Sequence, residues 1–229
     1  MKTIAIHQPN YFPWLGYFYK INSCDTFVVL DTVEYQYGNA SSVTNRCKIK
    51  TGSGMQLLSV PVLKSSEEKL ILNMKIDYKQ NWQRKHLNAI QTNYGKSKFF
   101  HEIFPILNEI ITNKYDSLSQ LNSTAIKKIC NYLNISTPIV FASDLNINQE
   151  DRNLRIIEIC KNLNGTIYLS GNGGKKYNDE SLYQQQHITL KYTTFVPPTY
   201  NQLYGDFLPN LSILDTLFNV GKDSVKHFF

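Results

Sequence analysis

A glycine-rich turn follows a strand-like segment late in the sequence. In "YLSGNGGKKYND", residues 168–179, an apolar run ends at Ser170 and three glycines follow within four positions. Glycine has no side chain and tolerates positive φ, so backbone amides in such a turn can approach a ligand closely, and anions are their natural ligands. A plain surface turn is the alternative, since the spacing matches neither a Walker loop nor a dinucleotide fingerprint. The candidate binding residues are Ser170, Gly171, Gly173, Gly174, Lys175, Lys176, Tyr177 and Asp179.

A second polar group follows the first strand-like segment, within "IHQPNYFPW", residues 6–14. His7 is expected at the carboxyl end of that strand, and its ordinary pKa of about 6.5 suits proton transfer. Gln8 and Asn10 offer amide donors and acceptors, and Pro9 and Pro13 fix the backbone around them. A histidine that only satisfies hydrogen bonds in the core is the competing interpretation. The aromatic residues of this segment are expected in the core or in a pocket wall.

Further candidates lie at the end of the next strand-like segment and in "VTNRCKI", residues 43–49. Asp31 closes "TFVVLD" and is expected at the same edge of the sheet as His7. Alternation in a strand directs Arg46 and Lys48 to one face, next to Asn45. A free guanidinium binds a phosphate or a carboxylate through two contacts, although an ordinary ion pair fits the sequence equally well.

A C-terminal helix is predicted from Pro209 to Val220, with leucines at core spacing. Gly221 is expected to end it, as a glycine after the last helical residue commonly does. Asp215 and Asn219 are four residues apart on one helical face. They either serve a binding site or hydrogen-bond neighbouring loops.

The apolar periodicity predicts a β-α-β opening and an α/β ending around these residues. Parallel strands joined by right-handed crossovers present functional groups in a crevice at their carboxyl ends. His7, Asp31 and the glycine-rich turn are therefore expected to face that crevice. The predicted strands are "TIAIH", "TFVVLD", "PIVFAS", "GTIYLSG" and "HITLKYTTF", with helices at residues 13–21 and 150–163.

The middle of the chain departs from this alternation. Residues 35–76 are predicted to form an antiparallel excursion, with strands in "CKIKTGSGMQLLSVPV" and "KLILNMKI" around the turn signal "TGSG". Residues 82–133 are predicted to contribute three helices. The expected fold is a single α/β domain, residues 1–229, with a Rossmann-like, mostly parallel sheet interrupted by these two segments.

Composition excludes several classes of protein. At 229 residues, with 42% apolar and 18% charged residues, the chain resembles neither a disordered segment nor a membrane protein, since no apolar run approaches the roughly 20 residues of a span. The net charge of +6 is spread over scattered lysines, so nucleic acid is not expected as a partner and small anions are. The N-terminus does not read as a signal peptide, and the four dispersed cysteines fit free thiols in the cytoplasm. No histidines or cysteines have metal-ligand spacing, and a homodimer is compatible with the sequence.

These motifs, in this order and over nearly the whole chain, resemble the WbqC-like family of bacterial proteins. The segments that carry the resemblance are "AIHQPNYFPWLGYFYKI", "NR.KI", "LSVPV", "YLSGNGGKKYND" and "LSILDTLFNVG". The resemblance implies a pathway, the synthesis of O-antigen and other surface polysaccharides, more firmly than a reaction. The positions that match the family pattern are His7, Gln8, Pro9, Asn10, Trp14, Gly16, Asp31, Asn45, Arg46, Ser170, Gly171, Gly173, Gly174, Tyr177, Gln202, Asp215 and Asn219.

This sequence departs from the family pattern in a few places. Asn172 stands where the family usually has proline, and Thr44 stands where it has a glutamine-like residue. Residues 35–43 match the family pattern only loosely. The layout is also similar to the nucleotidylyl-transferase and pantothenate-ligase superfamily, without its H-x-G-H signature, and this supports only the Rossmann-like fold.

The resemblance and the residues together predict a cytoplasmic transferase that N-acylates or aminoacylates a nucleotide-linked amino sugar. His7 is the expected base, with Asp31 grouped beside it, and Asn10 or amides of residues 171–174 stabilise the oxyanion. Arg46, Lys175 and Lys176 are expected to bind phosphates. The acyl donor would be an acyl-CoA or a carrier-bound acyl group. A nucleotide-dependent adenylyl or nucleotidyl transferase or ligase, and a non-catalytic glycan-binding or assembly module, are the alternatives.

Overall fold

The computed structural model describes residues 1–39, 42–64 and 69–229. Its main sheet has five strands in the order β5-β2-β1-β6-β7, and every neighbouring pair is parallel. This confirms the predicted Rossmann-like sheet. The strands are β1 (Thr3–His7), β2 (Thr26–Val29), β5 (Ile139–Phe141), β6 (Ile167–Ser170) and β7 (Thr189–Tyr192).

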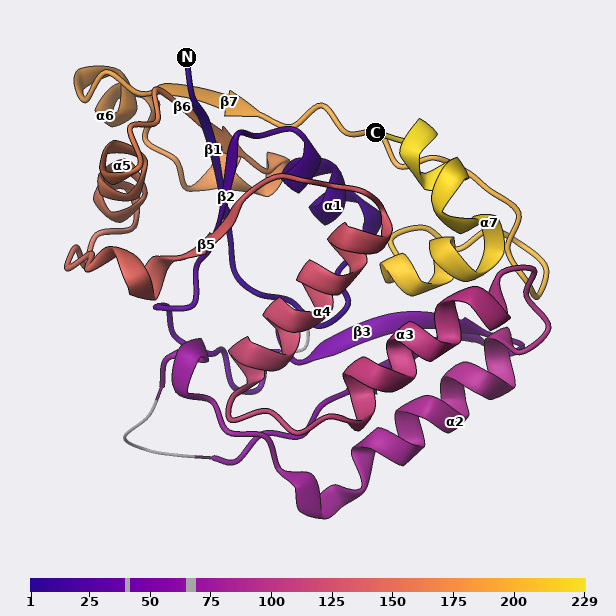
Figure 1. Ribbon diagram of the computed structural model, residues 1–229. Helices are drawn as coiled ribbons and strands as arrows, with labels where there is room; N and C mark the ends of the chain where they lie inside the picture. Colours follow the sequence, from indigo (N-terminus) through magenta and orange to yellow (C-terminus); the bar gives the residue numbers. More distant parts are fainter. Residues whose placement is uncertain (40–41, 65–68) are drawn as a thin grey trace.

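Helices cover both faces of this sheet, as Figure 1 shows. Helices α1 (Leu15–Asn22) and α4 (Leu118–Tyr132) lie on one side, and α5 (Arg152–Asn162) and α6 (Glu180–Gln185) lie on the other. Strand β1 is central, and the chain builds outward from it through β2 and β5 and later through β6 and β7. The strand order therefore reverses between β1 and β6, which is where α/β sheets of this kind open a crevice for ligands.

Alternating side chains of the central strands supply two hydrophobic cores. Ala5 and Phe27 pack toward the α1 and α4 side, in the larger core. Ile4, Ile6 and Val28 pack against α5 and α6, in the smaller one. Because both faces are buried, these strands read as short apolar runs in the sequence, and this is why they are predictable.

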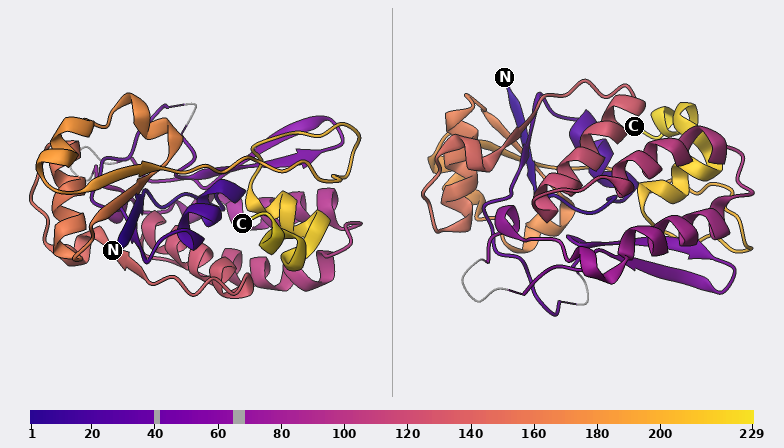
Figure 2. Two further views of the ribbon diagram at one scale, coloured as in Figure 1. Left: turned by 90° about the horizontal axis from the view of Figure 1, so that it is seen from above. Right: turned by 60° about the horizontal axis from the view of Figure 1, so that its bottom comes forward.

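The antiparallel excursion forms a separate module with the middle helices. The hairpin of β3 (Arg46–Thr51) and β4 (Gly54–Ser59) packs with α7, and α3 lies between α2 and α7. Figure 2 shows this group at the end of the molecule away from α5 and α6. The helices involved are α2 (Trp82–Tyr94), α3 (Phe100–Thr112) and α7 (Ile213–His227).

The predicted strand "KLILNMKI" is only partly a strand. Leu70 and Ile76 each make an isolated antiparallel bridge, and between them Ile71–Asn73 forms the 3₁₀ turn η1. Ile71 and Met74, three residues apart, are both buried, and a 3₁₀ turn places positions i and i+3 on one side. Residues 40–41 and 65–68 of the predicted excursion lie outside the described residues.

Gly221 was predicted to end the C-terminal helix, and it breaks the helical geometry without ending α7. Gly221 has φ 72° and ψ 175°, and a Cβ there would lie 2.5 Å from the ring of Phe99. Helical structure resumes after it and runs to His227. The helix begins later than predicted, because Ser212 caps it by accepting a hydrogen bond from the Leu214 amide (3.2 Å).

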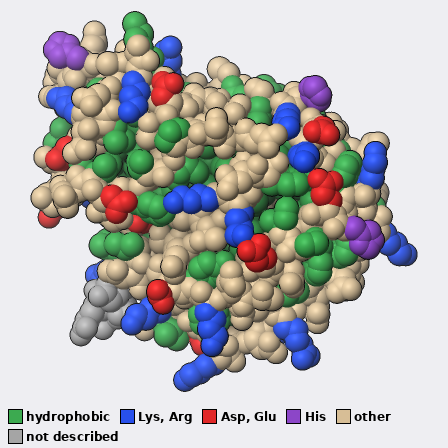
Figure 3. All heavy atoms as spheres, in the orientation of Figure 1, with side chains coloured by type: hydrophobic (Ala, Val, Ile, Leu, Met, Phe, Trp, Pro, Cys, Tyr) green, Lys and Arg blue, Asp and Glu red, His purple; other side chains and the backbone are tan. Residues whose placement is uncertain are grey.

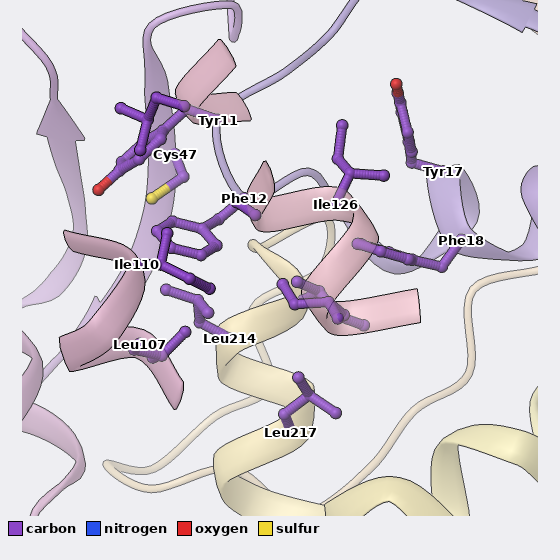
Figure 4. Packing of buried hydrophobic residues seen from close by; sticks show 14 of the residues in the cluster. Tyr11, Phe12, Tyr17, Phe18, Cys47, Leu107, Ile110, Ile126, Leu214 and Leu217 are labelled. Atoms are coloured by element: carbon purple, nitrogen blue, oxygen red, sulfur yellow. The ribbon is translucent and has the colours of Figure 1, made fainter. Parts of the chain in front are cut away.

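The aromatic residues of the opening segment are mostly core, as predicted. Tyr11, Phe12, Tyr17 and Phe18 are buried, and Figure 4 shows the Phe12 ring pointing toward Leu214 and Ile110. Trp14, by contrast, is 38% exposed. Phe12 has φ 39°, a left-handed conformation that a bulky residue adopts only under constraint.

The charged side chains of the described residues are mixed over the surface drawn in Figure 3. On the face drawn in Figure 3, lysine and arginine side chains are interspersed with acidic ones and form no single stripe.

The four cysteines are free, and burial raises the pKa of Cys24, Cys130 and Cys160 to about 12, which keeps these thiols protonated. None of the helices within the described ranges is long and apolar enough to cross a bilayer.

Candidate functional site

A cavity of about 530 Å³ opens at the carboxyl ends of β1 and β6, where the strand order reverses. It receives side chains from both faces of the sheet and from α1 and α5. Among the sequence-predicted candidates, His7, Gln8, Ser170, Gly171, Gly173, Gly174 and Tyr177 line it. The structure thus brings the opening segment and the glycine-rich turn into one place. Its remaining lining residues are Ile6, Lys20, Leu30, Val33, Arg152, Arg155, Ile156 and Tyr168.

His7 is held in one tautomer by its neighbours. Its Nδ1 lies 3.1 Å from the Gln8 carbonyl oxygen, and since a carbonyl only accepts, Nδ1 carries the proton and donates. The Nε2 atom is left with a lone pair. Burial, reinforced by the nearby charge of Lys20, lowers the pKa of His7 to about 4. The imidazole is therefore neutral at physiological pH and able to accept a proton or a hydrogen bond.

Lys20 is a site residue that the sequence analysis missed. It projects from α1, is 4% exposed, and donates to the Ile6 carbonyl oxygen at 2.8 Å. No carboxylate within the described ranges pairs with it in a salt bridge. Burial lowers its pKa to about 8, so it is still mostly charged at neutral pH. A buried ammonium without a counter-charge is costly, and an anionic ligand would supply what is missing.

Two arginines from the first turns of α5 add further positive charge. Arg152 lies over the Tyr177 ring, 4.6 Å from its centroid, and Arg155 donates to the carbonyl oxygens of Gln149 and Glu150. No aspartate or glutamate is found among the described residues that line the cavity. The side chains around it are therefore cationic, neutral polar or apolar. Such a cavity favours a ligand with several negative charges, such as a diphosphate.

Physical signals for these cations are present in the sequence. Lys20 lies three residues from Tyr17 and next to Ile21, on a helical face that is otherwise apolar. Arg152 and Arg155 are three apart at the start of a helix, where the macrodipole disfavours cations. A charge placed against its local preference often marks a site.

The glycine-rich turn forms η4 (Asn172–Lys176) directly after β6. Ser170 Oγ accepts a hydrogen bond from Asn178 Nδ2 (3.0 Å), which closes the turn over the end of the strand. Lys175 lies over the Tyr192 ring and Asp179 caps α6, so neither of these lines the cavity. Their proposed role in substrate binding stays a prediction.

Gly174 is the glycine of this turn that tolerates no side chain. A Cβ on Gly174 would lie 2.2 Å from Ser170 Oγ, whereas one on Gly173 meets nothing within 4 Å. We expect Gly174→Ala to displace Ser170, break its bond to Asn178 and cost about 1–2 kcal/mol of unfolding free energy. Urea denaturation measures this. Gly173→Ala is the matched control, and equal losses in the two variants would contradict the close packing at Gly174.

Asp31 lies near the cavity but points elsewhere. It is fully buried, and its two carboxylate oxygens accept hydrogen bonds from the amide (3.1 Å) and hydroxyl (2.9 Å) of Ser143. This clamp joins the segment after β2 to η3 (Ala142–Leu145), which follows β5. Asp31 therefore links two loops at the carboxyl edge of the sheet and does not line the cavity. Its catalytic role stays a prediction.

Asp215, Gln202 and Asn219 lie together in a different part of the molecule. The buried Asp215 carboxylate accepts hydrogen bonds from Tyr94 (2.9 Å), Tyr200 (2.8 Å) and Gln202 (2.8 Å). Asn219 accepts from the Leu203 amide at 3.1 Å. The sequence left open whether Asp215 and Asn219 serve a binding site or hydrogen-bond neighbouring loops, and these contacts fit the second role. The network fastens the segment before α7 to that helix.

Asn10, Asn45 and Arg46 also lie outside this cavity. Asn10 is buried, and Asn45 donates to the Val60 carbonyl oxygen at 2.8 Å within the hairpin region. Arg46 lines a second cavity of about 310 Å³, together with Lys48 on the same strand. Arg46 and the glycine-rich turn therefore line different cavities, and the phosphate-binding role of Arg46 stays a prediction.

Comparison with known proteins identifies the family of this chain. The profile of the WbqC-like protein family matches residues 8–227. The uncharacterized protein Rv1507c of Mycobacterium tuberculosis is 34% identical over 227 residues, covering 98% of this chain and 96% of that protein. No solved structure gives a significant match. The match over almost the whole length shows that the chain belongs to the WbqC-like protein family.

Proposed function

We propose that the protein is a cytoplasmic transferase that acylates the amine of an amino sugar while that sugar is linked to a nucleotide diphosphate. The proposal places the reaction in the cavity between β1 and β6. The observation that carries it is the set of cations Lys20, Arg152 and Arg155 around a neutral His7, with no described carboxylate to compensate them. A diphosphate supplies the complementary charge, and the glycine-rich turn supplies backbone donors.

The chemistry follows from the tautomer of His7. Its Nε2 lone pair accepts a proton from the neutral amine of the sugar as the lone pair of that nitrogen forms a bond to the acyl carbon. The bond from that carbon to the leaving group, a thiolate when the donor is an acyl thioester, then breaks. We assign stabilisation of the oxyanion that forms between these steps to amides of residues 171–174, because this turn lines the same cavity through Gly171, Gly173 and Gly174. Gln8 contributes a further polar group to the same wall.

Ligand-induced thermal stabilisation tests the substrate class. We expect a uridine-diphosphate-linked amino sugar to raise the melting temperature by several degrees at saturating concentration, because a ligand at 100 times its Kd adds about 2.7 kcal/mol. Uridine diphosphate alone should give part of this rise in melting temperature, and the free amino sugar should give little of it. A shift by the free sugar that equals that of the linked one would contradict a diphosphate-binding cavity.

Nucleotidyl transfer is the second candidate, and the position of the cavity at the reversal of strand order favours it. The order β5-β2-β1-β6-β7 is that of a nucleotide-binding Rossmann sheet, with the same crevice. Incubation with a nucleoside triphosphate and an acceptor separates the two reactions. Release of pyrophosphate supports nucleotidyl transfer, whereas loss of a free amine with release of the donor's thiol supports acylation. Of these two proposals, acylation of an amino sugar is the one that fits a role in surface-polysaccharide synthesis.

A further inference from the structure

The second cavity lies between the hairpin and the opening segment. It has a volume of about 310 Å³, which is within the range of small-molecule sites. Its walls are mainly apolar or aromatic, from Tyr11, Phe12, Trp14 and Val43. Arg46 and Lys48 lie among them, and no described lining residue is acidic. This combination suits a ligand with an apolar body and one negative end.

Arg46 is an incompletely satisfied cation at this place. Its Nε atom is buried and has no hydrogen-bond partner within the described ranges. A buried guanidinium nitrogen without an acceptor costs free energy, so a partner is expected from outside the chain. The planar fork of arginine matches a carboxylate in a two-point contact.

The part of the lining at Phe12 is held in a constrained shape. Phe12 has φ 39°, and its carbonyl oxygen accepts a hydrogen bond from Ser212 Oγ at 2.7 Å. The next residue, Pro13, accepts from the Ile213 amide at 2.9 Å. These bonds fasten the strained turn to the start of α7. Strain retained in a wall of this kind commonly marks a binding site.

We propose that this second cavity binds a small carboxylic acid with an apolar or aromatic body, with Arg46 on the carboxylate and Trp14 against the body. The cavity is distinct from the one at the strand ends, although one segment contributes to both. Gln8 lines the first and Tyr11 the second, and three residues of chain span at most about 11 Å. Ligands in the two cavities are therefore neighbours, as two substrates of one enzyme are.

Tryptophan fluorescence tests the proposal without any assay of turnover. Trp14 lines the cavity, and Trp82, the chain's other tryptophan, is 2% exposed and lies outside it. We expect 4-phenylbutyrate to change the emission in a saturable way, and 4-phenylbutyramide, which lacks the charge, to bind at least 10-fold more weakly. The wild-type response should disappear in Trp14→Phe. Equal binding of acid and amide would overturn the proposal.

Charge variants, followed by calorimetric titration, locate the site. Arg46→Met should weaken 4-phenylbutyrate about 10- to 100-fold, as loss of a charge-assisted hydrogen bond implies, while Arg84→Met, at an exposed position on α2, should not. Lys48→Met gives a second variant if Arg46→Met folds poorly, as judged by circular dichroism. A loss seen in Lys20→Met instead would overturn the proposal, because the acid would then bind at the strand ends. The His7→Asn variant should bind the acid normally, so the outcome is independent of the proposed transferase activity.

Discussion

Replacing Lys20 with methionine is expected to stabilise the fold and to weaken anion binding at the same time. Among the described residues the buried wild-type ammonium has the Ile6 carbonyl oxygen as its hydrogen-bond partner and no carboxylate, so methionine removes most of its desolvation cost. The pKa of Lys20 is lowered from 10.5 to about 8, which corresponds to about 3 kcal/mol. After allowance for the lost hydrogen bond, we expect a gain of about 1–3 kcal/mol in unfolding free energy.

The pH dependence of this gain has a defined sign. Below pH 8 the lysine is charged in both the folded and the unfolded chain, so the full cost of burying it is present. Between about pH 8 and 10.5 the folded chain releases its proton first, the wild-type protein becomes more stable, and the gain in Lys20→Met shrinks. Urea denaturation at pH 7 and at pH 10 measures both. A variant that is less stable than wild type at pH 7 would contradict the absence of a counter-charge.

Lys50 provides a matched control, because it is also a buried lysine. It is 2% exposed, donates to the carbonyl oxygens of Gly205 and Asp206, and interacts with the charge of Asp215. Lys50→Met should therefore lose stability. Lys20→Met should in addition lose most of the thermal shift given by a nucleotide-linked amino sugar, and Lys50→Met should keep it. A gain in stability for Lys20→Met together with a loss for Lys50→Met would indicate that Lys20 serves ligand binding and not the stability of the fold.

Replacing His7 with asparagine is expected to abolish most turnover while leaving ligand binding nearly intact. The asparagine amide can still donate to the Gln8 carbonyl oxygen, as His7 Nδ1 does, but it offers no equivalent of the Nε2 lone pair. Loss of a general base reduces kcat by roughly 10²- to 10⁴-fold. His101→Asn, at an exposed position on α3, is the control for the substitution itself. Retention of full kcat in His7→Asn would remove the base assignment.

The pH–rate profile of the wild-type enzyme should show how the ligand acts on His7. In the free protein its pKa is about 4, and the charge of Lys20 is one cause. A bound diphosphate offsets that charge, so the pKa of His7 should rise in the complex. The acid limb of kcat, which reports the complex, is therefore expected at higher pH than the acid limb of kcat/KM. Coincident limbs would indicate that no anion binds beside His7.

The sheet was predictable because its strands obey local rules. "TIAIH" and "TFVVLD" are short apolar runs separated by a helical segment, so β1, α1 and β2 follow from periodicity alone. The placement of β6 beside β1 follows from no spacing in the sequence, since the two strands pair across most of the chain. The prediction of a strand in "KLILNMKI" was wrong in part, because an alternating strand and a 3₁₀ turn both place apolar residues on one buried side.

The candidate site was predictable to a similar degree. His7 and the glycine-rich turn both follow apolar runs, and the topology of parallel sheets brings such positions to one edge. Lys20, Arg152 and Arg155 contribute charge from helices, where a cation usually indicates a solvated face. Arg152 is in fact exposed and Arg155 half-buried, whereas the burial of Lys20 depends on tertiary packing. Arg46 lies on β3 of the hairpin and lines a different cavity, a placement that no local pattern in the sequence indicates.

The central position of β1 has a consequence for how the protein is made. The Lys2 amide donates to Thr166 Oγ1, 164 residues away, at the point where β1 meets β6. During synthesis the first strand leaves the ribosome with its partner on that side still untranslated, and contacts of such long range form slowly. The row of backbone N–H and C=O groups along one edge of β1 thus stays unpaired until most of the chain has emerged, which makes early chains prone to aggregate. Productive folding of this protein should accordingly depend on chaperones that hold the nascent N-terminal segment.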